Sequence, residues 1–442
     1  MTNRQYKEIC LSKFESAKEL FEEKVYPNIE TYRKGSCKVR FTDKNGKPIC
    51  NTKVTVNQKT HDFKFGAHIF MLDEFETEEK NKEYRKIFKE FFNLATVPIY
   101  WNGLEPERGK PRFDKDSQKI YRRPAADLCL NYCDESGIDA KMHCLVYDKF
   151  IPDWLPKDDM KAMEELYEKR IKEIGEKYSE RLYEIEVINE LLSEHAWHGH
   201  SVISTKRDIL EWSFALARKY FKDNTLVVND GNYVPEIADK DYRHPYFMLI
   251  DAALSKGVEI DKIGIQNHIY CGVVRPQEEE IHDCCDFFDP QKIIKGFEYL
   301  SEFGKPLEIT EITIPTVGEG EEAEEIQAEL LKYLYTIWFS VPQMETIVYW
   351  NTVDSYAYEG ARWHENNCRG GLWHRDLTPK KSALMLKKLL YEVWHTDLEI
   401  KTDENGCAEF RGFYGDYEAE LNGETVKFGI HKAEENSYHL EF

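Results

Sequence analysis

The chain contains 442 residues, and its 60 Lys and Arg residues against 81 Asp and Glu residues give a formal net charge of −21. This length predicts two or three domains, or one large barrel with additions, and a hydrophobic share of 41% excludes a largely disordered chain. Nucleic acids and anionic membrane surfaces attract cationic proteins, so the net charge argues against both as partners.

The sequence offers no sign of a membrane span or of a disulfide framework. No apolar run approaches 18 residues, and the first residues lack the hydrophobic core of a signal peptide. We therefore expect a cytoplasmic protein, or a secreted one if an export signal has been removed. The 11 cysteines are odd in number, scattered and without C-x-x-C spacing, which favours reduced thiols and argues against a structural metal site.

The first 60 residues predict a helix followed by two strands. Residues 4–33 carry apolar side chains at the spacing of one helical stripe. Strand-like stretches follow at 37–42 and 53–57, and Asn45-Gly46 between them is a strong hairpin-turn signal. The pattern thus predicts an N-terminal helix and a β-hairpin.

From about residue 62, short apolar runs alternate with segments of helical periodicity. Continuous apolar strands are buried on both faces, which indicates a parallel sheet covered by helices. Eight strand–helix repeats predict a closed (β/α)₈ barrel, ending in a helix at 380–393. The eight runs are 63–69, 93–100, 140–147, 183–190, 225–230, 262–269, 306–313 and 346–353.

Beyond Trp394 the pattern changes to short strands separated by glycines. Neither these strands nor the early hairpin suffices for a stable sheet alone. We therefore expect the N-terminal helix and hairpin (1–60) to pack with the C-terminal module (394–442), and the two to form a small accessory β-sandwich beside the barrel (61–393).

In a (β/α)₈ barrel the active site lies at the carboxyl ends of the strands, so the last residues of each run are the candidates. Two of them are glutamates, Glu190 in the fourth run and Glu311 in the seventh. Paired carboxylates beside aromatic side chains are typical of glycosidases, in which one group is an acid and the other a nucleophile. Further candidates at strand ends are His143, Tyr147, Gln266, His268 and Trp350.

One other cluster has a spacing that could indicate a metal-binding site. His195, His198 and His200 have an HxxHxH spacing, but no carboxylate at the helical i+4 position supports a site. We expect a surface loop there, with no metal and no cofactor.

The order of these motifs resembles family 10 of the glycoside hydrolases, the retaining endo-β-1,4-xylanases. The resemblance covers about residues 62–392. It is carried by the segments Phe65-Gly66-Ala67, Trp101 with Glu105-Pro106, His143-Cys-Leu-Val-Tyr147 with Pro152 and Trp154, Val187-Ile188-Asn189-Glu190, Asn229-Asp230, Gly264-Ile-Gln266-Asn-His268, Ile309-Thr310-Glu311, Trp350 with Asp354, and Pro379-Lys380-Lys381-Ser382-Ala383.

The resemblance implies roles for these residues. Glu190 would be the acid/base and Glu311 the nucleophile, and His268 would orient Glu311. Asn189 would bind the 2-hydroxyl of the sugar at the scissile bond. The other implied substrate contacts are His143, Gln266, the Trp350 platform, Tyr147, Trp101 and Tyr358, the last in place of a family tryptophan.

The chain also departs from the family pattern. Members usually carry Glu-Asn-x-Met-Lys-Trp on the second strand, whose Glu, Asn and Lys bind the −2 xylose, whereas this chain reads Thr96-Val97-Pro98-Ile99-Tyr100-Trp101. Tyr147-Asp148 replaces the usual Trp-His, and Phe150 replaces a glutamine. Binding energy from remote sugars contributes to rate, so we expect altered glycone specificity and slow hydrolysis of linear xylan.

The sequence thus predicts a retaining, xylanase-like β-glycoside hydrolase that acts on xylan or a related β-linked oligosaccharide. Two alternatives stay open: another β-glycosidase, of β-glucanase or β-galactosidase type, and a non-catalytic carbohydrate-binding barrel. The sequence leaves open the sugar at −2, endo or exo action, and the oligomeric state.

Overall fold

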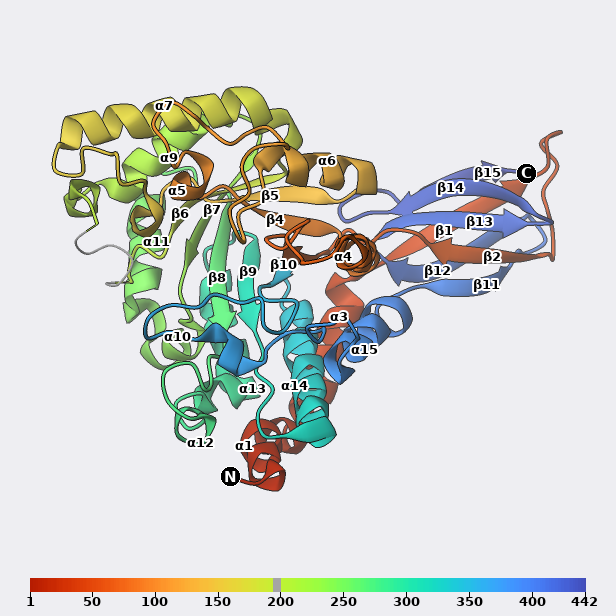
Figure 1. The fold of residues 1–442 in the computed structure, drawn as a ribbon. Helices are drawn as coiled ribbons and strands as arrows, with labels where there is room; N and C mark the ends of the chain where they lie inside the picture. Colours follow the sequence, from red (N-terminus) through yellow and green to blue (C-terminus); the bar gives the residue numbers. More distant parts are fainter. Residues whose placement is uncertain (194–199) are drawn as a thin grey trace.

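The computed structural model describes residues 1–193 and 200–442 and contains the predicted barrel (Figure 1). Its eight strands are all parallel, and β10 closes the barrel by pairing with both β9 and β3. The strands are β3 (Lys64–His68), β4 (Leu94–Pro98), β5 (Asp139–His143), β6 (Glu184–Asn189), β7 (Thr225–Asp230), β8 (Lys262–His268), β9 (Leu307–Thr313) and β10 (Met344–Tyr349).

Helices surround the barrel and alternate with its strands, which confirms the predicted (β/α)₈ class. The long ones are α4 (Glu78–Phe91), α6 (Ala126–Ser136), α7 (Met160–Tyr178), α9 (Ile209–Tyr220), α11 (Pro245–Ser255), α13 (Pro290–Ser301), α14 (Gly320–Ser340) and α15 (Lys381–Lys388). Short helices lie in the loops: α5 (Trp101–Leu104), α10 (Val234–Lys240) and α12 (Gln277–Glu280). Within the described residues, no helix is long and apolar enough to cross a membrane.

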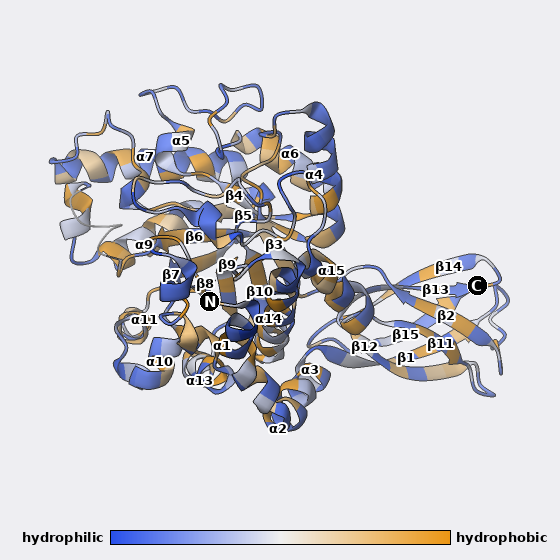
Figure 2. Cartoon of the chain, turned by 60° about the horizontal axis from the view of Figure 1, so that its bottom comes forward, coloured by the Kyte–Doolittle hydropathy of each residue, from blue (hydrophilic) through white to orange (hydrophobic). Residues whose placement is uncertain are grey.

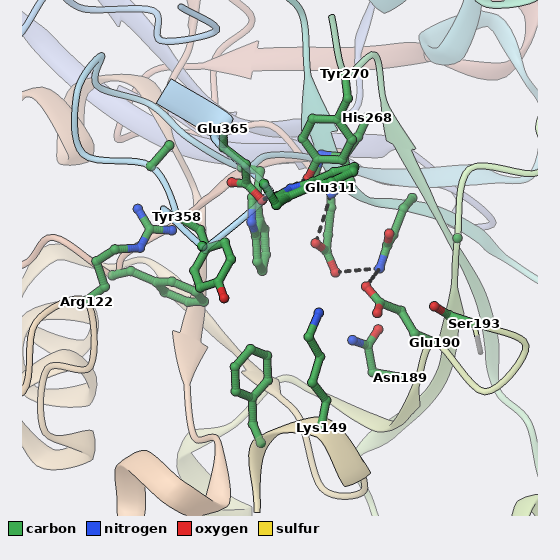
Figure 3. A pocket seen from close by; sticks show the side chains of 18 of the residues that line it. Arg122, Lys149, Asn189, Glu190, Ser193, His268, Tyr270, Glu311, Tyr358 and Glu365 are labelled. Carbon is green, nitrogen blue, oxygen red and sulfur yellow. Dashed lines mark hydrogen bonds and ion pairs between the residues drawn. The ribbon is translucent and has the colours of Figure 1, made fainter. Parts of the chain in front are cut away.

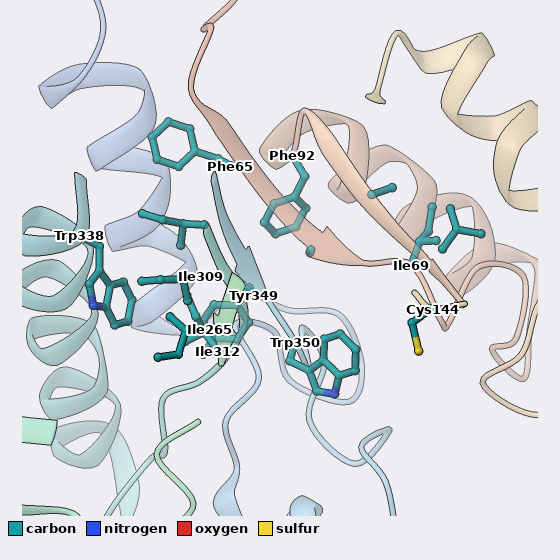
Figure 4. Close-up of a cluster of buried hydrophobic side chains, with 14 of the residues drawn as sticks. Phe65, Ile69, Phe92, Cys144, Ile265, Ile309, Ile312, Trp338, Tyr349 and Trp350 are labelled. Carbon is teal, nitrogen blue, oxygen red and sulfur yellow. The ribbon is translucent and has the colours of Figure 1, made fainter. Parts of the chain in front are cut away.

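The core lies inside the barrel and between its strands and helices. Figure 2 shows hydrophobic residues concentrated along the central strands and the inner helix faces. Trp338 of α14 and the strand residues Ile265, Ile309 and Tyr349 are fully buried and belong to one cluster (Figure 4). These residues hold the strands in fixed register, which fixes the side chains at the strand ends.

The N-terminal helices lie against the barrel. They are α1 (Asn3–Ser16), α2 (Lys18–Leu20) and α3 (Tyr26–Tyr32). The ring of Phe14 stacks on Tyr333 of α14 at 5.1 Å, so α14 is covered on two sides and is buried over most of its length. The apolar stripe of this helix thus meets α14 of the barrel, while the C-terminal module contacts its last turn, where Arg411 donates to the carbonyl of Glu30.

Strands from both chain ends form the predicted accessory sandwich, at the right in Figure 1. One sheet has the order β12-β1-β15 and the other β11-β2-β13-β14, and side chains from both build a second core. The strands are β1 (Lys34–Thr42), β2 (Lys53–Gln58), β11 (Asp397–Lys401), β12 (Cys407–Phe413), β13 (Gly415–Leu421), β14 (Glu424–Ile430) and β15 (Ser437–Glu441).

The predicted N-terminal hairpin is wrong in one respect. A turn does form at Asp43–Lys47, with Gly46 at a φ of 77°. However, β1 and β2 enter different sheets, since β1 pairs with β12 and β15 while β2 pairs with β11 and β13. The partners that decide this pairing lie some 340 residues later in the chain.

Candidate active site

A cavity of about 1320 Å³ opens at the carboxyl ends of the barrel strands. Strand ends on opposite sides of the barrel contribute polar groups to it, as expected for this fold. Nine of the ten predicted site residues line it: His143, Tyr147, Asn189, Glu190, Gln266, His268, Glu311, Trp350 and Tyr358.

The two glutamates face each other across a single amide. The Nε2 of Gln266 donates to Glu190 Oε1 at 3.0 Å and to Glu311 Oε1 at 3.1 Å, and the dashed lines in Figure 3 trace this bridge. The distance between the two carboxylate oxygens therefore cannot exceed the sum of these two hydrogen-bond lengths. That limit lies below the roughly 6.5–9.5 Å between carboxyl groups of inverting glycosidases and is compatible with the about 5–5.5 Å of retaining ones.

Backbone geometry helps to aim Glu190. It is the first residue after β6 and has a φ of 53°, a left-handed conformation that costs non-glycine residues of order 1 kcal/mol or more. Its amide nitrogen donates to the carbonyl of Asn229 at 3.0 Å. The turn thereby directs the side chain away from the strand and into the cavity.

Tyr147 contacts Glu190 directly. Its hydroxyl donates to Glu190 Oε2 at 2.5 Å, so the residue that replaces the family tryptophan is a hydrogen-bond donor to a carboxylate. Next to it, Asp148 accepts hydrogen bonds from the backbone and hydroxyl of Ser201. Tyr147 therefore fixes Glu190, and Asp148 fixes the chain at Ser201.

Glu311 is held from two sides in the interior of β9. Asn229 donates to Glu311 Oε1 at 3.1 Å and to Asn189 Oδ1 at 2.8 Å, and Asn229 itself accepts from the hydroxyl of Thr310 at 2.5 Å. His268 Nε2 lies 3.1 Å from the other oxygen, Glu311 Oε2. Both oxygens of Glu311 are thus fixed by neighbouring strands.

The contacts of His268 define its protonation. Burial lowers the pKa of His268 to about 4, so the ring is neutral at physiological pH. Its Nδ1 lies 2.9 Å from the Thr313 hydroxyl, which can donate, whereas an ionised Glu311 can only accept. We assign the proton to Nε2, where it donates to Glu311.

A chain of buried charges extends from Glu311 into the barrel. Glu186 lies between His143 and Lys141 and pairs with both. Burial raises the pKa of Glu186, but the two cations outweigh this effect and hold it at about 2. Burial lowers the pKa of His143, but Glu186 outweighs it and the pKa is raised. A cationic imidazole therefore stands beside Glu311.

Burial raises the pKa of Glu311 to about 8, and His143 opposes this shift while Glu186 and Glu190 add to it. Burial therefore favours the protonated form of Glu311, whereas the charge on His143 favours the ionised form.

Aromatic rings line the cavity around these groups. Trp350, at the end of β10, packs edge-on against His143, His268 and Phe70, with ring centroids 5.3, 6.2 and 5.1 Å away. Tyr358, on the loop that follows β10, is 39% exposed at the opening (Figure 3). Such faces suit the C–H groups of sugars.

The prediction for Trp101 is wrong. Its side chain is 3% exposed, does not line the cavity, and packs on Tyr167 and Trp154 at 4.6 and 6.1 Å. The indole donates to Glu105 at 3.2 Å. The chain turns into α5 immediately after Tyr100, so Tyr100 faces the cavity and the following residue points into the helical layer.

Sequence reasoning assigned no role to several site residues. Asn229, which bonds Glu311, is the second-to-last residue of β7; the strand-end rule could have identified it, although it entered the sequence analysis only as part of a family motif. Arg123, Lys149 and Tyr270 instead come from segments between strands and helices, where no periodicity indicates which side chains turn inward.

Among residues 1–193 and 200–442, one group could hold a metal ion: His143, Glu186 and Glu311, whose ligand atoms lie within 4.8 Å of one another. The partners of Glu186 favour a different role, since Lys141 and His143 already neutralise it. Of the histidine cluster, His195 and His198 lie outside the described residues.

Comparisons with known proteins agree with this geometry. A sequence model of glycosyl hydrolase family 10 matches residues 57–388. The chain belongs to this family. The matched region contains all eight barrel strands and both glutamates.

Individual relatives in the comparisons are distant. The chain is 25% identical over 395 residues to the anti-sigma-I factor RsgI6 of Acetivibrio thermocellus, covering 88% of this chain and 45% of that protein. It is 23% identical to endo-1,4-beta-xylanase 1 of Arabidopsis thaliana, covering 90% and 38%. Xylanase 10B of Thermotoga petrophila, solved with xylobiose, shares the fold, with a TM-score of 0.59 at 20% identity over 74% of this chain and 94% of that one. The chain therefore spans less than half the length of these two curated relatives.

Proposed function

We propose that the protein is a retaining β-glycoside hydrolase of the endo-β-1,4-xylanase type. Glu311 attacks the anomeric carbon, and Glu190 protonates the leaving oxygen and then activates water. The observation that carries this proposal is the Gln266 bridge, which keeps the two carboxylates at a separation suited to double displacement.

The surrounding residues receive supporting roles in this mechanism. Asn189 and His143 bind hydroxyls of the sugar at the cleavage site, and Trp350 provides its apolar platform. Neutral His268 and Asn229 hold Glu311 in its attacking position. Tyr147 steadies Glu190. None of these roles needs a metal or a nucleotide.

We propose xylan or a related β-linked oligosaccharide as the substrate. Family membership and relatives named xylanases support this class. Tyr100 stands where family members carry polar residues for the next sugar, so we expect unsubstituted xylohexaose to be a poor substrate. The barrel, 61–393, is the proposed catalytic unit, with 1–60 and 394–442 as accessory segments.

Two variants test the assignment of roles. On an aryl β-xylobioside with a good leaving group, Glu311→Ala should lose roughly 10³-fold or more in kcat/KM. Glu190→Ala should keep the first step, because this leaving group needs no acid, and azide should rescue its turnover as a β-glycosyl azide. A 2-fluoro-xylobioside should label Glu311 covalently in the unmodified protein.

The outcomes separate the alternatives. Hydrolysis of a β-glucan or β-galactoside, with no xylan hydrolysed, would identify another β-glycosidase specificity that uses the same two glutamates. Saturable sugar binding with no turnover and no label would identify a carbohydrate-binding barrel. An α-anomer as the first product, observed by NMR, would exclude retention.

A further inference from the structure

Arg123 reaches the cavity from the loop before α6 and lies on aromatic rings. Its guanidinium carbon is 4.1 Å from the ring centroid of Tyr100, and 5.5 and 5.6 Å from those of Phe70 and Phe150. A guanidinium held by cation–π contacts with three rings is restrained in position, and its N–H donors lie in its own plane. The structure thus presents a rigid, oriented hydrogen-bond donor.

Two rings, those of Tyr100 and His143, lie between this arginine and Glu311. The ring of Tyr100 packs edge-on against His143 at 4.9 Å, and His143 stands beside Glu311. Arg123 therefore faces the sugar next to the cleavage site, on the side of β4.

No carboxylate of residues 1–193 and 200–442 pairs with Arg123, whose one side-chain hydrogen bond there runs from Nη1 to the carbonyl of Arg122 at 2.8 Å. Burial lowers its pKa to about 10, which leaves it charged at neutral pH. Other carboxylates of the cavity have partners: Glu236 pairs with Lys240, Asp283 with Arg275, Glu359 with His364, and Glu365 with Asn351.

A second cation lies on the same cavity. Lys149 is exposed, and in Figure 3 its amine points into the space between Tyr358 and Glu190. The described residues give Lys149 no ion pair, and its amine is 5.6 Å from the Phe150 ring centroid. In a protein of net charge −21, two unpaired cations on one cavity indicate an anionic ligand.

We propose that Arg123, assisted by Lys149, binds the carboxylate of a uronic acid unit in the substrate. The inference rests on the proposed function and narrows its substrate class to acidic, uronic-acid-substituted β-xylan oligosaccharides. The in-plane N–H groups of Arg123 match the two oxygens of a carboxylate. Tyr100 and Phe150, which support Arg123, provide apolar faces for the sugar ring.

A substitution at Gly103 can test the position of Arg123 independently of its charge. A Cβ at Gly103 would lie 3.1 Å from Cδ and 3.2 Å from Cγ of Arg123. Gly103→Ala would therefore displace the arginine while keeping its charge. Loss of acidic-sugar recognition in this variant would show that the placement of Arg123 matters as well as its charge.

The test compares two substrates that differ in one group. One is xylotetraose with a glucuronic acid branch, and the other is the same oligosaccharide after reduction of its carboxyl group to an alcohol. We expect the protein to prefer the acid by about tenfold or more in kcat/KM, since hydrogen bonds to charged groups are the strong ones. The preference should fall as salt concentration rises.

The variants assign that preference to the two cations. Arg123→Gln should abolish it, lowering kcat/KM for the acidic substrate to the level of the reduced one. Lys149→Gln should weaken it less, because this side chain is exposed. Arg362→Gln is the charge-matched control, since Arg362 is exposed and lies outside the cavity lining, and it should leave the preference intact.

Binding separates this inference from the proposed function. Calorimetry on Glu311→Gln should give tighter binding of the acidic oligosaccharide than of the reduced one, and Arg123→Gln should remove the difference. If no glycan is hydrolysed, the proposed function fails and this binding result alone decides the inference. Equal affinity for both, or equal losses on both in Arg123→Gln, would overturn it.

Discussion

At the scale of single residues, the electrostatics of Glu311 can be tested through pH. The pKa of Glu311 is raised to about 8 chiefly by burial; Glu186 and Glu190 add to the shift and His143 opposes it. As the proposed nucleophile, Glu311 must be ionised, so its titration should set the acidic limb of kcat/KM on an activated aryl glycoside. Glu190→Gln removes a like charge and should move this limb to lower pH.

The reverse variant provides the control. His143→Gln removes the cation beside Glu311 and should move the same limb to higher pH, whatever it does to the absolute rate. The acidic limbs of the two variants should therefore shift in opposite directions from that of the unmodified protein. Limbs that coincide, or that move the same way, would mean that another group controls the titration.

Site residues could be predicted where the chain obeys a simple geometric rule. Glu190, Gln266 and Glu311 lie at or near the ends of buried parallel strands, and the fold gathers such ends. Trp101, which the family resemblance implied as a substrate contact, lies outside the cavity because one residue of helical turn after Tyr100 rotates its side chain away. Arg123 could not be predicted as a site residue, because no local sequence pattern indicates which side chain of a long loop turns inward.

At the scale of elements, a glycine on β8 links packing to the site. A Cβ on Gly264 would lie 2.6 Å from the methyl carbon of Thr310 on β9 and 2.9 Å from the carbonyl oxygen of Val228 on β7. Gly264→Ala should therefore destabilise the protein by about 1–3 kcal/mol through overpacking. Activity should also fall, because Thr310 bonds Asn229, which holds Glu311. Urea unfolding measures the first effect and kcat the second.

A second substitution identifies the cause. Thr310→Ser removes the crowded methyl group but keeps the hydroxyl that bonds Asn229. In the Gly264→Ala background it should restore part of the lost stability, with the contact to Val228 accounting for the rest. A double variant no more stable than Gly264→Ala alone would contradict this explanation.

The elements themselves differed in how well the sequence predicted them. Barrel strands stood out as unbroken apolar runs because both their faces are buried, and they pair with neighbours close in sequence. The pairing of β1 and β2 could not be predicted in the same way. Their turn at Gly46 is local, but each strand pairs with partners near the other end of the chain, so tertiary contacts overrode the hairpin signal.

At the scale of the whole molecule, a few side chains join the sandwich to the barrel. Trp394 leads into the C-terminal strands and packs on Phe339 and Phe65, with ring centroids 4.4 and 5.8 Å away. Arg33, just before β1, is 6% exposed and lies with its guanidinium over Phe63 and Phe339. These two connections to the sandwich, and Phe63 in the third one between β2 and β3, thus meet near the end of α14.

This joint should stabilise the molecule without affecting catalysis. Arg33 donates to the carbonyl oxygens of Phe339 and Val341 at the end of α14, and Arg33→Met would remove one donor from each, with Val341 keeping the amide of Met344. We expect a loss of about 1.5–3 kcal/mol in unfolding free energy, with kcat/KM unchanged. Arg40→Met is the matched control, because Arg40 is exposed on β1, and should alter stability by at most about 0.5 kcal/mol. Equal effects of the two substitutions would show that the sandwich is held to the barrel by other contacts, and a fall in kcat/KM for Arg33→Met would show that the sandwich influences the active site.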